Sequence, residues 1–156
     1  MLHRLWMIAI GVAVCASAQK YDGPLPSKPD LPYIKQAATL IPMETADVRA
    51  EKAGSGTRFL IEGAASSVKT PISLPIFILK VQKVAPEHLQ LYKMEAKEGH
   101  REYVVGGANP PDVLHLEVTR LTADGLCRIA VSDPLEAGEY VLSGDASQQV
   151  YCFQVF

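Results

Sequence analysis

The sequence predicts an all-β protein, an antiparallel β-sandwich of immunoglobulin-like type with about seven to nine strands. From residue 37 onward, short segments rich in Val, Ile, Leu, Tyr and Phe recur about every ten residues, with Gly, Pro, Asn and Asp between them. No long window keeps the apolar period of about 3.6 that marks an amphipathic helix. We therefore divide the chain into residues 1–18, 19–36 and 37–156, of which the last forms the sandwich domain.

The first 18 residues have the three parts of a secretory signal peptide. His3 and Arg4 form a short basic start, Leu5–Val14 is an apolar run, and Ala16–Ala18 supplies the small residues of a cleavage site. A membrane-spanning helix needs about twenty apolar residues, roughly twice the length of this run. We therefore expect cleavage before Gln19 and export to the periplasm or the extracellular space, with no membrane span in the mature chain.

Residues 19–36 are predicted to form a proline-rich extended arm or linker. Four prolines lie here, at Pro24, Pro26, Pro29 and Pro32. Proline fixes φ and lacks an N–H donor, so we expect this stretch to stay outside any sheet interior. A polyproline ligand is the alternative interpretation because the spacing fits P-x-x-P, although any proline-rich linker produces such matches.

Nine segments of the remaining chain have the composition of strands. They are residues 39–51, 57–62, 74–83, 88–97, 101–106, 113–120, 126–132, 138–143 and 149–156. The segment 74–83 has apolar residues at both odd and even positions, which is typical of a strand buried on both faces. We expect it to be a central strand.

Residues 89–105 are predicted to form a hairpin around a two-residue turn at Glu98–Gly99. This register places Ala96 opposite Arg101. One face then carries the apolar side chains of Tyr92, Met94, Tyr103 and Val105. The other face carries the polar and charged side chains of Lys93, Glu95, Lys97, His100 and Glu102.

The charged face of this hairpin is the candidate interaction surface, with the loop 106–112 beside it. Its acidic residues alternate with Lys93, Lys97 and Arg101. Such alternation is more typical of a solvated, salt-bridged strand face than of a catalytic acid/base pair.

Alternation along the last three segments predicts which side chains point into the core. Glu139 and Ser143 are expected to point outward, and Cys152 to lie on the face opposite the core. The inward side chains are those of Cys127, Ile129, Val131, Tyr140, Leu142, Tyr151, Phe153 and Val155.

The turn at Pro134–Tyr140 resembles a tyrosine corner. In that device a Tyr near the start of a strand donates its hydroxyl proton to a backbone carbonyl a few residues upstream. We expect Tyr140 to have this structural role. Antibody domains carry Cys two residues later, where this chain has Leu142, so the likeness is to the corner alone.

Four stretches together resemble a group of exported bacterial proteins of uncharacterised function. The most distinctive are PLEAGEYVLS at Pro134–Ser143 and VYCF at Val150–Phe153. The full set is residues 89–105, 113–119, 133–143 and 150–155, roughly half of the mature chain. The resemblance implies an exported immunoglobulin-like sandwich. It implies no catalytic residue, because the group has no established activity.

Cleavage of the leader would remove Cys15 and leave Cys127 and Cys152, which in an oxidising compartment invite a disulfide. The bridge would close a loop of about 25 residues and stabilise the fold by roughly 3 kcal/mol. Alternation argues against it, because the two side chains are predicted to point to different faces of their strands. The other possibility is two separate thiols, at least one of them buried.

The composition excludes several function classes. A net charge of −2 excludes a nucleic-acid binder that works through bulk positive charge. His88, His100 and His115 stand far apart, and His115 beside Glu117 is more typical of a solvated strand than of a metal site. No G-x-S-x-G or S-x-x-K motif marks a nucleophile. We therefore predict no catalytic, cofactor-binding or metal-binding residue.

These observations favour a non-catalytic binding or structural module of a bacterial envelope, whose partner is another envelope protein. The first alternative is a small secreted hydrolase or thiol-redox protein that uses Cys127, Cys152 or His115. A more remote alternative is a small outer-membrane β-barrel. It is disfavoured because Cys152 and Gln154 occupy positions that should face lipid, and aromatic residues make up only 7% of the chain.

Overall fold

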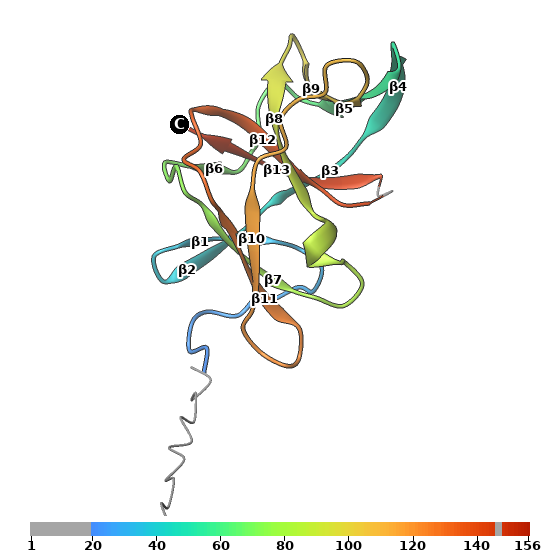
Figure 1. The fold of residues 1–156 in the computed structure, drawn as a ribbon. Coiled ribbons are helices and arrows are strands. Elements are labelled where there is room, and N and C mark those ends of the chain that lie inside the picture. The colour runs from blue at the N-terminus through green and yellow to red at the C-terminus, as the bar shows by residue number, and fades with distance from the viewer. Residues whose placement is uncertain (1–19, 146–147) are drawn as a thin grey trace, which may run out of the picture.

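The computed structural model describes residues 20–145 and 148–156, which form two β-sheets packed face to face (Figure 1). The predicted all-β sandwich is confirmed, and the immunoglobulin-like strand order stays a prediction. The signal peptide predicted for residues 1–18 lies outside the described residues. Within the described part, no helix has the length and apolar character needed to cross a membrane.

The smaller sheet has five strands. In spatial order they are β10 (Leu116–Arg120), β11 (Leu126–Val131), β7 (Ile76–Lys80), β1 (Tyr33–Gln36) and β2 (Thr39–Pro42). All neighbouring pairs are antiparallel. β7 lies in the middle, as predicted for the segment 74–83.

The larger sheet has eight strands. Seven follow one another in the order β3 (Glu44–Asp47), β13 (Gln149–Val155), β12 (Gly138–Ser143), β8 (Gln90–Ala96), β9 (His100–Gly106), β5 (Gly56–Glu62) and β4 (Arg49–Ala53). The eighth, β6 (Lys69–Thr70), pairs in parallel with the end of β13. A single 3-10 turn, η1 (Pro86–His88), precedes β8.

The described residues form thirteen strands, more than the predicted number. The segment expected as one strand over 39–51 is divided into β2, β3 and the start of β4. The division arises because the chain changes its pairing partner after Pro42 and again at Val48. The two-residue β6 and the strand β1 add to the count.

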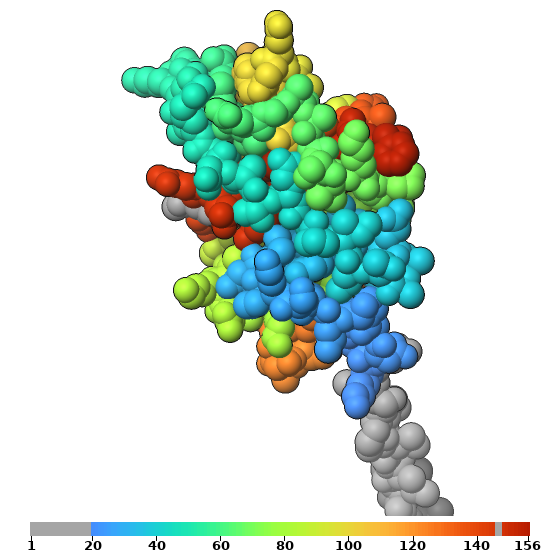
Figure 2. All heavy atoms as spheres, turned by 180° about the vertical axis from the view of Figure 1, so that it is seen from behind, coloured from blue at the N-terminus to red at the C-terminus, as the bar shows by residue number. Residues whose placement is uncertain are grey.

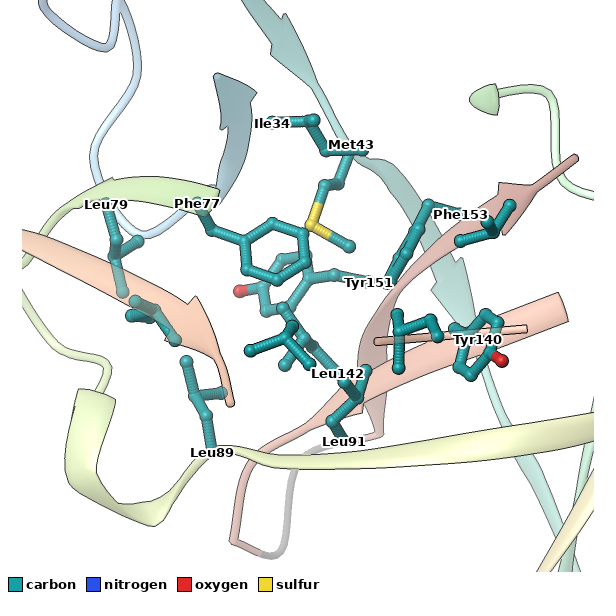
Figure 3. Packing of buried hydrophobic residues seen from close by; sticks show 14 residues of the cluster. Ile34, Met43, Phe77, Leu79, Leu89, Leu91, Tyr140, Leu142, Tyr151 and Phe153 are labelled. Atoms are coloured by element: carbon teal, nitrogen blue, oxygen red, sulfur yellow. The ribbon is translucent and has the colours of Figure 1, made fainter. Parts of the chain in front are cut away.

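The main core lies between the two sheets (Figure 3). Phe77 of β7 meets Phe153 of β13 edge to face with ring centroids 5.3 Å apart, and Phe153 stacks on Tyr140 at 5.5 Å. Each such ring pair contributes about 0.5–1.5 kcal/mol beyond the burial of its area. Ile78 points away from this core, yet only 1% of it is exposed, so both faces of β7 are buried.

The predicted arm is wrong at its C-terminal end, because Tyr33–Gln36 form β1 between β7 and β2. The prolines stop at Pro32, so every residue of β1 keeps its N–H for the sheet. The preceding segment packs on the domain: the Tyr33 hydroxyl lies 2.9 Å from the Ser27 hydroxyl and accepts from the Lys28 N–H at 3.2 Å. Two of the prolines in the P-x-x-P pattern, Pro26 and Pro32, are buried, which contradicts a displayed polyproline ligand.

Asp30 fixes this segment to the loop after β7. Its carboxylate Oδ1 accepts hydrogen bonds from the backbone N–H groups of Gln82, Lys83 and Val84 at 2.8, 2.9 and 3.0 Å. Partial burial opposes ionisation of this carboxyl group, but the three donors prevail and lower its pKa. The carbonyl of Asp30 also accepts from the Tyr151 hydroxyl at 2.6 Å.

The larger sheet curls, so that β3 and β4, which are neighbours in the chain, stand at opposite ends of its strand order. Its inner side holds a second apolar cluster: Ile61, Tyr92, Met94, Tyr103, Val141, Val150 and Cys152. The prediction that Glu139 points to solvent is therefore wrong, since it is only 5% exposed. Alternation placed it on the correct face, but the curl of the sheet covers that face.

Two local predictions agree with the structure. In the hairpin, Ala96 pairs with Arg101, and the Lys97 N–H donates to the His100 carbonyl at 2.8 Å across the turn. At the end of the predicted corner, the Tyr140 hydroxyl donates to the Glu136 carbonyl at 2.8 Å, which is the bond that a tyrosine corner requires.

Candidate binding site at a split in the larger sheet

The chain changes its pairing partner at Val48, between β3 and β4. On one side of Val48, β4 pairs with β5 up to the pair Arg49 and Leu60. On the other side, β3 pairs with β13 from the pair Asp47 and Gln149 onward. β3 and the end of β5 therefore diverge, and the sheet is split between them.

Charge gives a physical reason for the position of this split. If the ladder between β4 and β5 continued by two residues, Asp47 would lie opposite Glu62. Like charges directly opposite on neighbouring strands destabilise the pairing. The ladder ends just before it would bring these two carboxylates together.

β3 leaves backbone groups unused at the split. The Val48 N–H donates to the Gln148 carbonyl at 2.9 Å, so Val48 and every second residue before it face β13. The N–H and C=O groups of Thr45 and Asp47 must then point away from β13. Within the described residues β3 has no ladder on that side.

The split forms a cleft of about 510 Å³. Figure 2 shows the segments around it on one face of the molecule: the teal β3–β4 region, the green end of β5 and the yellow tip of the hairpin. Three lining residues are acidic: Asp47, Glu62 and Glu98. The others are Val48, Arg49, Leu60, Ile61, Gly99 and His100.

The cleft carries an excess of negative charge. Among the described residues, Asp47, Glu62 and Glu98 form no ion pair, whereas both basic lining residues are engaged. Arg49 pairs with Glu51 at 3.5 Å, and His100 lies 3.2 Å from Glu102.

Arg101 joins the two sides of the split. Its side chain is only 1% exposed. The guanidinium donates to the carbonyls of Gly63 and Glu62 at 2.8 and 3.0 Å, at the end of β5. It also forms a bidentate pair with Glu44 of β3, at 2.9 and 3.2 Å. The side chain of Arg101 thus links β3 to the end of β5, where, within the described residues, no backbone hydrogen bonds of a ladder join the two strands.

Glu139 and Ser66 complete this buried polar cluster. The Ser66 N–H donates to Glu139 Oε2 at 3.0 Å, and its hydroxyl donates to Glu44. Glu139 Oε2 is 3.7 Å from Nη1 of Arg101, and its other oxygen has no hydrogen-bond partner in the described residues. The loop after β5 is therefore held down by two carboxylates that converge on one arginine.

The pKa values of the two carboxyl groups, Glu139 and Glu44, are shifted in opposite directions. Burial raises the pKa of Glu139, and the nearby Ser66 N–H and Arg101 only partly offset it. Burial also opposes ionisation of Glu44, but its hydrogen bonds to Arg101 and Ser66 prevail and lower its pKa. Glu44, with its bidentate contacts at 2.9 and 3.2 Å, is also the closer of the two partners of Arg101.

Sequence reasoning missed Arg101, because it was grouped with the salt-bridged exposed face of the hairpin. The structure places it on the inner side, and the signal was its alternation with Tyr103, which is also buried. Nothing local indicated its partner Glu44, which lies 57 residues away in the chain.

The charged side chains on the candidate interaction surface of the hairpin form ion pairs with neighbouring side chains. Lys93 pairs with Glu136 at 3.0 Å, and Lys97 with Glu95 at 2.7 Å. His100 and Glu102 also lie together, as described above. Of the five predicted surface residues only His100 lines the cleft, and the role of the other four stays a prediction.

The residues named for the redox or hydrolytic alternative lie apart. Cys127 belongs to β11 of the smaller sheet and Cys152 to β13 of the larger one, and both thiols are free and buried. Burial raises the pKa of Cys127 and raises that of Cys152 to about 12. His115 is exposed just before β10. No group of three potential metal ligands occurs in the described part of the chain.

No protein-family model, curated protein or solved structure matches this chain. The likeness to exported bacterial proteins therefore stays a prediction.

Proposed function

We propose that this chain is an exported, non-catalytic β-sandwich module that binds a partner of the cell envelope at the split between β3 and β5. The observation that carries the proposal is the cleft itself, whose volume of about 510 Å³ falls in the usual range of binding pockets, about 300–1,000 Å³. One of its walls is a strand edge with unused backbone groups, which a protein normally covers or uses for binding.

The chemistry of the buried groups supports binding over catalysis. A reactive cysteine needs an accessible thiolate, and burial keeps both thiols of this domain in the protonated form. The carboxylates of Glu44 and Glu139 converge on Arg101, where they hold the sheet together. Neither carboxylate lines the cleft.

The proposal is tested by photo-crosslinking in the envelope of the cell that encodes the chain. A benzophenone amino acid is placed at Arg49, an exposed side chain at the cleft. The matched control carries the same group at Thr119, an exposed residue of β10 on the smaller sheet.

We expect a discrete covalent adduct from position 49 that is absent from position 119. It should disappear when Asp47→Asn and Glu62→Gln are combined in the same chain. Irradiation that gives no adduct at position 49, or the same adduct at both positions, contradicts the proposal. Mass spectrometry of the exported chain separately checks that it begins at Gln19.

A further inference from the structure

We infer that the occupant of this cleft is an extended basic peptide segment, which pairs with the free edge of β3 as an additional strand. The inference rests on the proposed function, because it names the class of partner for the same cleft. Two independent features of the split support it: the orientation of the backbone of β3 and the charge of the walls.

The backbone of β3 offers the hydrogen bonds of a strand edge. The N–H and C=O groups of Thr45 and Asp47 point away from β13, and Asp47 lines the cleft. Together they can bond to alternate residues of a segment lying about 4.8 Å away. Strand addition to an exposed edge is an established mode of peptide recognition, in which the main chain provides affinity and alternate side chains provide specificity.

The walls of the cleft select the charge of that segment. Asp47 and Glu62 would be directly opposite each other in a continued ladder, so a segment added along the edge of β3 would lie near both carboxylates. Glu98 adds a third negative charge at the rim. A Lys or Arg side chain of the added segment would offset the repulsion between Asp47 and Glu62.

The apolar lining fits the remaining side chains of the segment. In an extended strand, successive side chains point to opposite faces. If every second residue is basic and meets the carboxylates, the residues between them turn toward the other face, which along β5 is the face of Ile61, because Leu60 shares its face with Glu62. The site therefore fits alternating basic and aliphatic residues.

The test uses a fluorescein-labelled peptide of alternating Lys and Val, seven residues long, and the chain purified after export. Fluorescence anisotropy at low salt should show binding that weakens as salt is added. A peptide of alternating Glu and Val should not bind. An N-methylated Lys–Val peptide, which cannot donate backbone hydrogen bonds, should bind at least about tenfold more weakly.

Two double variants locate the binding. Asp47→Asn with Glu62→Gln should weaken binding of the Lys–Val peptide by about tenfold or more. Glu117→Gln with Asp133→Asn removes the same charge at exposed positions away from the cleft and should leave binding unchanged.

Equal binding of the Lys–Val and Glu–Val peptides, no binding of either, or an equal loss in the two double variants overturns this inference. The photo-crosslink at position 49 keeps its failure distinguishable from that of the proposed function. If the adduct forms in the envelope while the Lys–Val peptide fails to bind, the cleft is a binding site for another class of partner. If neither occurs, both proposals fall.

Discussion

Arg101 has almost no contact with solvent, and its hydrogen bonds reach two backbone carbonyls of one strand end and a carboxylate of another strand. A buried charge is tolerated only when its donors are satisfied and its charge is balanced. Both conditions depend on Glu44. Loss of this one carboxylate would leave the buried cation with Glu139 alone, whose nearer oxygen is 3.7 Å away.

We predict that Glu44→Gln lowers the free energy of unfolding by about 3 kcal/mol. The amide keeps the size of the side chain but turns an acceptor into a donor that faces the guanidinium. Urea denaturation at neutral pH measures the change. Glu117→Gln, at an exposed position of β10, is the matched control and should change stability little. A Glu44→Gln chain as stable as the control would show that Arg101 does not depend on this partner.

Glu139 gives a second prediction, in the pH dependence of stability. Its pKa is raised in the folded chain above the ordinary 4.5, so the folded state binds this proton more tightly than the unfolded state. Its contribution to stability is therefore complete below about pH 4.5 and is lost as the pH rises through the folded-state pKa. Glu139→Gln, which stays neutral, should become more stable relative to the wild type between pH 4 and pH 8.

Urea denaturation of both chains at several pH values checks this trend. Glu44 and Asp30 have lowered pKa values, so their contributions are lost as the pH falls, in both chains alike. The difference between the two chains isolates Glu139. A difference that stays constant with pH, or that reverses in sign, would contradict the assignment of a raised pKa to this group.

At the scale of elements, the two consecutive strands on either side of Val48 pair with different neighbours: β3 with β13, and β4 with β5. Each of the two strands, β3 and β4, pairs antiparallel with a longer strand. The split between them coincides with the place where two carboxylates would meet across the ladder. We therefore regard the repulsion between Asp47 and Glu62 as part of what keeps the cleft open.

Reversing one of these charges should close the cleft. Asp47→Lys would place an ammonium group opposite Glu62, and an oppositely charged cross-strand pair contributes about 0.2–1 kcal/mol. We expect a small gain in unfolding free energy, together with loss of Lys–Val peptide binding. Urea denaturation and anisotropy measure the two effects. Asp133→Lys is the control for the change in net charge, and a variant that binds the peptide as the wild type does would refute the role of this pair.

At the scale of the whole molecule, the sequence predicted correctly those features that depend on residues close together in the chain. Alternation and turn residues were enough to predict the sandwich, the pairing of Ala96 with Arg101 and the position of Tyr140. The predictions failed where the outcome depends on which strands become neighbours. The curl of the larger sheet buries Glu139, and the pairing of β1 with β7 draws Tyr33–Gln36 into a sheet.

The cleft could not be predicted for the same reason. Its walls come from β3, β5 and the hairpin turn, and the two sides of the split are joined by Arg101, whose carboxylate partner is distant in the chain. No local pattern marks Val48 as the point where the pairing changes. The only available hints were the inward alternation of Arg101 and the acidic residues now known to face the split.

The measurement that tests the central claim most directly is amide hydrogen exchange at Thr45 and Asp47, resolved by NMR, with and without the Lys–Val peptide. In the free chain these two amides should exchange fast, and those of Ala46 and Val48, which face β13, should be protected. Saturating peptide should slow exchange at Thr45 and Asp47 by about tenfold or more, since an added strand would bond to them. Amides that are already protected in the free chain, or that stay unchanged with peptide bound, would contradict a free strand edge at the split.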